Sequence, residues 1–246
     1  MAETHVLEIH GLCKNFGGTV AIDDFNAQVE SGQIVGIIGP NGAGKTTIIN
    51  TVSRIVKQDK GSLYFDGKCL DRMPMWEVAR QGIGRTFQNI RLFNSLSVQE
   101  NVMLVLKERY GRLSEKEQRE QSAQLMADFG WTGSLDAHPS GLPYGTKRKL
   151  ELIRAMALDP KLLMLDEPAA GMNPVEIQEL IRYIREIREK HNLAIVVIEH
   201  RMEVIRGLCN HVYVQASGKT IAQGTSESVI NDPKVIEAYL GDKRIC

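Results

Sequence analysis

The sequence lacks a long apolar segment, and this absence limits what the protein can be. Its longest apolar runs lie at residues 34–38, 162–165 and 194–198. Each is far too short to cross a bilayer, which takes roughly 20 residues as a helix. The chain therefore cannot form a membrane channel by itself. Residues 1–5 also lack a basic region followed by an apolar one, so we expect no secretion signal and a cytoplasmic protein.

Paired cysteines and an excess of charge are missing too. The four cysteines form no C-x-x-C pair and the six histidines no H-E-x-x-H cluster, so we expect neither a disulfide framework nor a transition-metal site. Basic and acidic residues each number 30, which gives a formal net charge of zero. Nucleic-acid-binding proteins usually have a basic surplus, so we expect no nucleic-acid partner.

The composition is that of an ordinary globular protein, with 43% hydrophobic and 24% charged residues over 246 positions. This size allows a sizeable core, arranged as one domain with a subdomain or as two small domains.

One stretch carries a strong chemical signal. Residues 39–46 fit the pattern G-x-x-x-x-G-K-[ST], between a predicted strand and a predicted helix. The glycines let the backbone curl so that its N–H groups point at phosphates, and the helix start adds its positive dipole end. Lys45 is expected to reach the β- and γ-phosphates of a nucleotide, and Thr46 a Mg²⁺ ion. The nucleotide-binding residues predicted here are Gly39, Pro40, Asn41, Gly42, Ala43, Gly44, Lys45, Thr46 and Thr47.

Apolar periodicity along the rest of the chain predicts an α/β core. We expect strands at residues 6–10, 27–30, 34–38, 61–66, 83–87, 161–166 and 194–198, and a hairpin of 212–215 with 219–222. We expect helices at residues 44–56, 75–81, 98–109, 114–129, 174–190 and 233–240. Residues 89–158 show no strand pattern, so we interpret them as a helical subdomain inserted into a core formed by residues 1–88 and 159–246.

Two carboxylates follow the buried strand at residues 161–166. Asp166 ends the strand, where a phosphate loop needs an acidic partner for Mg²⁺, and Glu167 comes next. One carboxylate can hold the metal while its neighbour orients the attacking water and accepts its proton. Two solvated acids in a turn are the alternative.

Gln88 and His200 also follow predicted core strands. The Gln88 amide could sense Mg²⁺ or the attacking water, and it could pass that state to the helical insertion. The His200 imidazole could hydrogen-bond the γ-phosphate near neutral pH. An ordinary polar residue and a structural histidine are the alternatives, and spacing alone leaves them open.

Residues 142–146, Leu-Pro-Tyr-Gly-Thr, precede a basic amphipathic helix. Pro143 and Gly145 fit a helix entrance whose free N–H groups could bind an anion. A helix that is merely capped is the alternative, and these residues alone do not decide between the two.

Together these residues resemble the ATP-binding subunit of ABC transporters, in the same order and over nearly the whole chain. The matching family motifs are Walker A (39–46), the Q-loop glutamine (Gln88), the signature (142–146), Walker B with its glutamate (162–167) and the switch histidine (His200). The resemblance implies a RecA-like P-loop NTPase core with an N-terminal antiparallel β subdomain and an inserted α-helical subdomain. It also implies that Phe16 stacks on adenine, for which a core phenylalanine is the alternative.

The family further implies an ATPase that works in pairs. Two subunits, identical or homologous, face head to tail, and Pro143, Tyr144 and Gly145 of each complete the ATP site of the other. Glu167 and His200 would be catalytic. The residues implied to hold Mg²⁺ are Thr46, Gln88 and Asp166.

The resemblance also implies membrane partners. ATP binding and ADP release would move a groove between core and helical subdomain, where transmembrane permease subunits dock. A periplasmic or extracellular substrate-binding protein would be an indirect partner, and the chain would be peripheral on the inner face of the cell membrane.

Several shorter segments resemble one subfamily of these ATP-binding subunits. Residues 85–89, 166–174, 198–200 and 238–241 resemble the ATPases of branched-chain amino-acid importers. The expected function is therefore ATP hydrolysis coupled to import of branched-chain or other hydrophobic amino acids. Amide or urea importers, lipopolysaccharide export and a soluble non-transport ABC ATPase are the alternatives. A GTPase or small-molecule kinase would not explain residues 142–146 or His200.

Two departures from the family pattern concern the dimer. The signature serine is Pro143 here, with Tyr144 in place of a glycine and Thr146 in place of a glutamine, so contact with the opposite γ-phosphate would depend on the Gly145 N–H and the helix dipole. The aspartate usual after Walker B is Asn173. We still expect an active ATPase.

Overall fold

The computed structural model describes residues 5–111 and 113–241. Residues 1–4 and Cys246, which entered the arguments on secretion and disulfides, lie outside the described residues. A six-stranded sheet forms the centre of the fold, in the order β10-β9-β3-β8-β7-β6. Its strands are β3 (Ile34–Ile38), β6 (Ile83–Arg85), β7 (Leu162–Asp166), β8 (Ala194–Ile198), β9 (His211–Ala216) and β10 (Lys219–Gly224).

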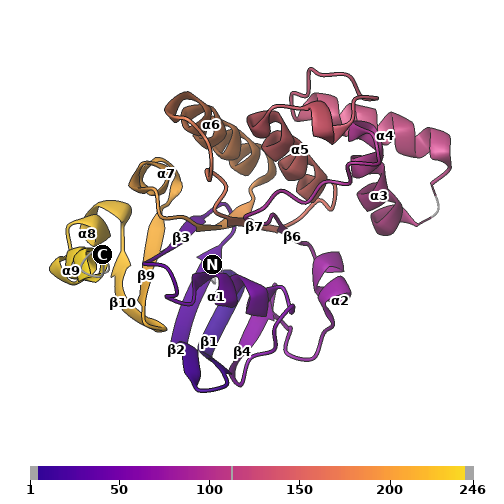
Figure 1. Ribbon diagram of the computed structural model, residues 1–246. Coiled ribbons are helices and arrows are strands. Elements are labelled where there is room, and N and C mark those ends of the chain that lie inside the picture. Colours follow the sequence, from indigo (N-terminus) through magenta and orange to yellow (C-terminus); the bar gives the residue numbers. More distant parts are fainter. Residues whose placement is uncertain (1–4, 112, 242–246) are drawn as a thin grey trace.

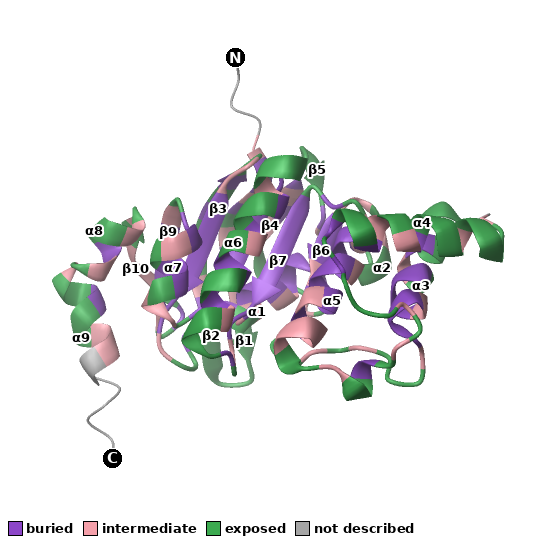
Figure 2. Cartoon of the chain, turned by 90° about the horizontal axis from the view of Figure 1, so that it is seen from above, coloured by how far each residue is buried: buried purple, intermediate pink, exposed green. Residues whose placement is uncertain are grey.

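All neighbouring strands of this sheet are parallel except β10, which runs antiparallel to β9. Every residue of β3, β7 and β8 is buried, as their continuous apolar sequences predict for parallel strands covered on both faces. Figure 2 shows β3 and β7 in purple at the middle of the molecule. Because β3, β7 and β8 point the same way, the residues that follow them meet at one edge of the sheet.

A second, antiparallel sheet has the strand order β2-β1-β4-β5. Its strands are β1 (His5–Phe16), β2 (Thr19–Glu30), β4 (Lys60–Phe65) and β5 (Lys68–Cys69). Helix α1 (Lys45–Val52) packs between this sheet and one face of the central sheet, because Ile48, Ile49 and Val52 share a single apolar core with residues of both. Figure 1 shows α1 and this second sheet on the same side of the central sheet.

The helices on the other face of the central sheet form a second core. They include α5 (Tyr144–Met156), α6 (Pro174–His191) and α7 (Met202–Leu208). Helix α6 buries Ile177, Leu180, Ile181, Ile184 and Ile187 at three- and four-residue steps, as its sequence pattern predicts. The short helices α8 (Ser226–Ile230) and α9 (Pro233–Gly241) follow β10.

Between β6 and β7 the described residues form helices and connecting loops, without a strand. These helices are α3 (Val98–Tyr110), α4 (Glu115–Asp128), the 3₁₀ turn η1 (Pro139–Gly141) and α5. Ser97 and Ser114 open α3 and α4 with capping boxes. We propose residues 89–158 as a helical subdomain within a core of residues 1–88 and 159–246, because β6 ends just before this segment and β7 begins just after it.

Several boundaries differ from the sequence prediction. The strand expected to reach Phe87, and to end at Gln88, stops at Arg85. Thr86 N–H still donates to Met164 O of β7 at 2.9 Å, but Phe87 N–H donates to a side chain of α5, Glu151, at 3.4 Å. The chain therefore leaves the sheet for the helical segment two residues earlier than predicted.

The expected helix at residues 44–56 also ends early, at Val52. Arg54 has a left-handed φ of 59°, and Ile55 and Val56 both donate their N–H to Asn50 O, which closes the helix. Strands β1 and β2 are longer than predicted because their pairing continues through several register shifts. Helix α2 (Met75–Arg80) lies where it was expected, whereas α7 and α8 were not predicted, being too short for clear periodicity.

Candidate functional site

The phosphate loop (residues 39–46) joins the end of β3 to the start of α1. Gly39 and Gly44 have positive φ values of 149° and 94°. A Cβ on Gly39 would lie 2.0 Å from Gln215 O, and one on Gly44 would lie 2.1 Å from Ala21 O. The neighbouring backbone therefore requires glycine at both positions, and the sequence pattern has a steric cause.

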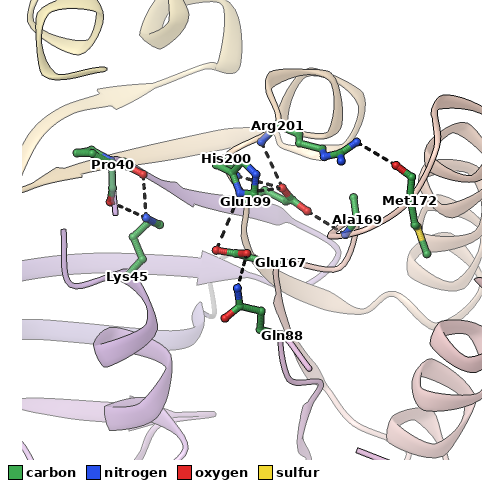
Figure 3. Close-up of polar contacts among 10 residues, drawn as sticks. Pro40, Lys45, Gln88, Glu167, Ala169, Met172, Glu199, His200 and Arg201 are labelled. Atoms are coloured by element: carbon green, nitrogen blue, oxygen red, sulfur yellow. Dashed lines mark hydrogen bonds and ion pairs between the residues drawn. The ribbon is translucent and has the colours of Figure 1, made fainter. Parts of the chain in front are cut away.

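Lys45 is buried beneath this loop. Its Nζ donates to the carbonyl oxygens of Gly39 and Pro40, both at 2.8 Å (Figure 3). Burial lowers the pKa of Lys45, while the charges of Glu167 and Asp166 oppose this shift. Thr46 is exposed at the helix start and Thr47 is half-buried. The loop therefore presents one cation, one hydroxyl and the first N–H groups of a helix to a common space.

Asp166 is the last residue of β7, and it is buried at the carboxyl end of the strand with only 3% of its surface exposed. Burial raises the pKa of its carboxyl group, and the guanidinium of Arg85, 3.3 Å away, opposes that shift. Arg85 also donates to Ser53 Oγ, just after α1, at 2.8 Å. Asp166 Oδ1 has no hydrogen-bond partner among the described residues although it is buried, so one carboxylate oxygen is free for a cation or water.

The backbone leaves the direction of β7 at Glu167, the residue after the strand, which has a left-handed φ of 46°. Its N–H donates to Ile198 O at 2.9 Å, which fixes the turn. Its Oε2 accepts from Gln88 Nε2 at 2.8 Å, and its Oε1 lies 3.9 Å from His200 Nδ1 (Figure 3). Three residues predicted from separate stretches of sequence are therefore side by side.

Glu199 is a residue that sequence reasoning missed. It is fully buried and accepts three backbone N–H groups, from Ala169 at 2.9 Å, His200 at 3.0 Å and Arg201 at 3.2 Å (Figure 3). This carboxylate ties the segment after Glu167 to the segment that carries His200. The sequence did contain a signal for this role. Glu199 directly follows the apolar strand at residues 194–198, and a buried carboxylate without hydrogen-bond partners is energetically unfavourable there, so partners could have been expected.

Phe16 ends β1 with 49% of its surface exposed. The alternative of a core phenylalanine is therefore excluded. Lys14 Nζ lies 5.4 Å from the ring centroid, and the free face of the ring can stack on a flat group.

The signature turn (residues 142–146) lies at the start of α5. Tyr144 is 39% exposed, and a Cβ on Gly171 would contact its ring at 3.7 Å. Gly145 faces Glu176 at the start of α6. Among the described residues, no hydrogen bond joins this turn to the phosphate loop of the same chain.

Arg148 and Glu151 were also missed, because the sequence pattern counted Arg148 within a basic helix face. They form a buried pair at 2.6 Å, with 0% and 1% of their side chains exposed. Their partners lie in the loop that carries Gln88.

Comparison with known proteins places the chain in a family. The ABC transporter family matches residues 22–170, and the branched-chain amino acid ATP-binding cassette transporter family matches residues 219–244. The chain belongs to the ABC transporter ATP-binding family. Its predicted fold class is confirmed by the solved ADP conformation of MJ1267, an ATP-binding cassette of an ABC transporter. That structure has a TM-score of 0.87 and 29% identity, over 96% of this chain and 99% of that one.

Two curated relatives of this ABC ATPase match over almost their full length. The high-affinity branched-chain amino acid transport ATP-binding protein LivG of Escherichia coli K12 is 38% identical, over 96% of this chain and 98% of LivG. The lipopolysaccharide export system ATP-binding protein LptB of Haemophilus influenzae is 35% identical, over 97% of this chain and 98% of LptB. Within residues 5–111 and 113–241, no helix is both long and apolar enough to span a membrane.

Proposed function

We propose that this ABC ATPase is the ATP-hydrolysing subunit of an importer for branched-chain or other hydrophobic amino acids. The observation that carries this proposal is the near full-length similarity to LivG, joined by the match of residues 219–244 to the branched-chain amino acid family. The subunit works as one of a head-to-tail pair, bound to a membrane permease on the inner face of the membrane. A separate substrate-binding protein delivers the cargo.

The phosphate loop holds the triphosphate of ATP. Lys45, which now donates to two loop carbonyls, exchanges these partners for β- and γ-phosphate oxygens, and charge-assisted hydrogen bonds are stronger than neutral ones. Backbone N–H groups at residues 39–47 surround the phosphates, and the exposed ring of Phe16 stacks on the adenine.

A Mg²⁺ ion fits the polar groups at this edge of the sheet. The free and buried Oδ1 of Asp166 and the exposed hydroxyl of Thr46 are suitable hard oxygen donors, and Gln88, in the loop after β6, contacts the neighbouring Glu167. The described residues contain no group of three His, Cys, Asp or Glu that could hold a metal unaided, as expected for an ion bound mostly by phosphate and water. When bound, Mg²⁺ neutralises charge that develops on the phosphates.

Glu167 accepts the proton of the attacking water. Its carboxylate is anchored by Gln88 on one oxygen, which leaves the other directed toward His200 and the space above the phosphate loop. His200 is 51% exposed on its side chain and donates to the γ-phosphate. Gln88 therefore contacts the general base. Through this contact it transmits the nucleotide occupancy of the site to the helical subdomain.

The second subunit supplies the signature turn. Pro143, Tyr144 and Gly145 of one chain face the γ-phosphate bound by its partner, and the absence of a hydrogen bond between this turn and the phosphate loop within the described residues of one chain is consistent with that arrangement. The permease docks between core and helical subdomain, where a groove of about 720 Å³ is lined by charged residues of both parts. Trp76, 57% exposed, offers an apolar contact beside this groove, because the guanidinium of Arg80 lies over its ring.

Co-expression with the permease genes that neighbour this one tests the proposal. We expect the chain to co-purify with the permease, and branched-chain amino acids with their binding protein to stimulate its ATPase activity. Stimulation by a lipopolysaccharide-extracting permease instead would favour the export function of LptB, the second candidate. If the chain never associates with any neighbouring permease, transport is the wrong function.

A further inference from the structure

Among the residues that the structure describes, Arg148 is the largest fully buried side chain. It lies on the second turn of α5, and its guanidinium donates to two backbone carbonyls of another segment, Phe87 O at 2.9 Å and Gln88 O at 3.0 Å. The same group donates to Tyr144 Oη at 3.2 Å. One side chain thus holds both the loop that carries Gln88 and a residue of the signature turn.

Glu151 completes this contact one helical turn later. Its Oε2 accepts from Arg148 at 2.6 Å. Its Oε1 accepts from the N–H groups of Phe87 at 3.4 Å and Arg91 at 3.5 Å. The two charges therefore bind both donors and acceptors of the loop backbone directly, and of the Arg148 guanidinium only Nε has no partner among the described residues.

Such a pair resists separation of the loop from the helix. Two charges that are wholly buried and hydrogen-bonded cannot part without leaving an uncompensated charge in a region of low dielectric, which is strongly unfavourable. The planar guanidinium fork fixes orientation as well as distance, because it binds several acceptors at once. The loop at residues 87–91 and the first two turns of α5 should then move as one rigid body.

The two ends of this rigid body, the Gln88 loop and the signature turn, belong to two different ATP sites of the proposed pair. At one end, Gln88 Nε2 donates to Glu167 Oε2 at 2.8 Å. At the other end is the signature turn, which meets a different ATP molecule in the proposed pair. We infer that Arg148 and Glu151 are the positioning residues that transmit nucleotide occupancy at Glu167, through Gln88, to the signature turn of the same chain. This inference rests on the proposed ATPase function.

Hydrogen–deuterium exchange of the full chain tests the link, with and without Mg²⁺ and a non-hydrolysable ATP analogue. The chain is kept at a concentration where light scattering reports single chains, so that a second subunit does not protect the turn. In the parent protein we expect the analogue to change exchange at least about twofold in both the Gln88 loop (residues 87–91) and the signature turn (residues 142–146).

The test variant replaces both charges by apolar side chains of similar size, Arg148→Met with Glu151→Leu, a change that buried ion pairs often tolerate. We expect the analogue still to change exchange in the Gln88 loop but no longer in the signature turn. The matched control is Lys149→Met on the same helix, whose ammonium donates to Gly130 O at 2.6 Å and not to the loop. It should leave both responses intact.

A signature turn that still responds in the paired variant would overturn the inference, and so would a parent turn that never responds while the phosphate loop does. If the paired variant does not fold, Arg148→Lys decides by the same two responses, because an ammonium keeps the charge but cannot reproduce the fork. If the analogue leaves residues 39–47 unchanged in the parent, the proposed ATPase function has failed instead.

Discussion

Replacing Glu167 by glutamine removes a proton acceptor from the centre of the site and leaves the side chain almost unchanged in size. Gln88 Nε2 donates to Glu167 Oε2 at 2.8 Å, and a glutamine can keep this contact through its own carbonyl oxygen. The backbone at residue 167 is fixed separately, by the N–H bond to Ile198 O. The substitution therefore changes chemistry and leaves the geometry nearly intact.

The expected loss of turnover is at least about 100-fold, which is the lower end of what a general base contributes. It corresponds to about 2.7 kcal/mol of activation free energy, at about 1.36 kcal/mol for each factor of ten. His200 is a neighbouring base, but its Nδ1 lies 3.9 Å from the carboxylate and half of its side chain faces solvent. We expect it to replace only a small part of the lost function.

Binding of ATP should be unaffected or slightly tighter in this variant. Lys45 and the loop glycines are unchanged, and one negative charge near the γ-phosphate is lost. Phosphate release under saturating MgATP measures turnover, and equilibrium titration with a fluorescent nucleotide measures affinity. Glu179→Gln is the control, since Glu179 is exposed on α6, and it should leave both quantities within about twofold of the parent. Turnover of Glu167→Gln within about threefold of the parent would remove Glu167 from the role of general base.

Three further outcomes follow from the structure. Lys45→Ala should weaken ATP binding by about 10- to 100-fold, since hydrogen bonds from a charged group contribute about 1.5–3 kcal/mol, and unchanged affinity in a titration would contradict the phosphate-loop assignment. Asn173 caps α6 by accepting from Val175 and Glu176 N–H, so Asn173→Ala should lower the free energy of unfolding by about 1 kcal/mol. Asn173→Asp should keep it nearly unchanged in urea denaturation; equal losses in both would rule out the cap. Burial raises the pKa of Cys209 to about 12, whereas Cys69 is exposed. A thiol reagent at pH 8 should therefore modify native Cys69 and reach Cys209 only after unfolding, as mass spectrometry of peptides can show.

The ends of the buried strands, and the acidic residue at one of them, could be predicted from the local sequence. Strands β3 and β8 end where their apolar runs end, and Asp166 follows from the same rule. The positions of Arg148 and Glu199 were not predictable, because each is buried by contacts with distant segments. Arg148 lies 61 residues from Phe87, whose carbonyl it binds. From the sequence of α5 alone, Arg148 would be interpreted as a solvent-exposed charge. Only the tertiary structure supplies the hydrogen-bond acceptors that make its burial possible.

The starts of the helices bear on the choice between an anion site and a capped helix at residues 142–146. Helices α3, α4 and α6 each begin with a side chain that caps the first N–H groups, from Ser97, Ser114 and Asn173. Helices α1 and α5 begin after Gly44 and Pro143, residues that have no side-chain acceptor to offer. A merely capped helix is therefore not what Pro143 provides. Helices α2 and α7 also begin without a side-chain cap, and the Glu176 carboxylate lies beside Gly145, so an uncapped helix start does not by itself mark a phosphate site. In the proposed mechanism, Pro143 stands in place of the signature serine, and the contact with the opposite γ-phosphate would depend on the N–H groups around Gly145.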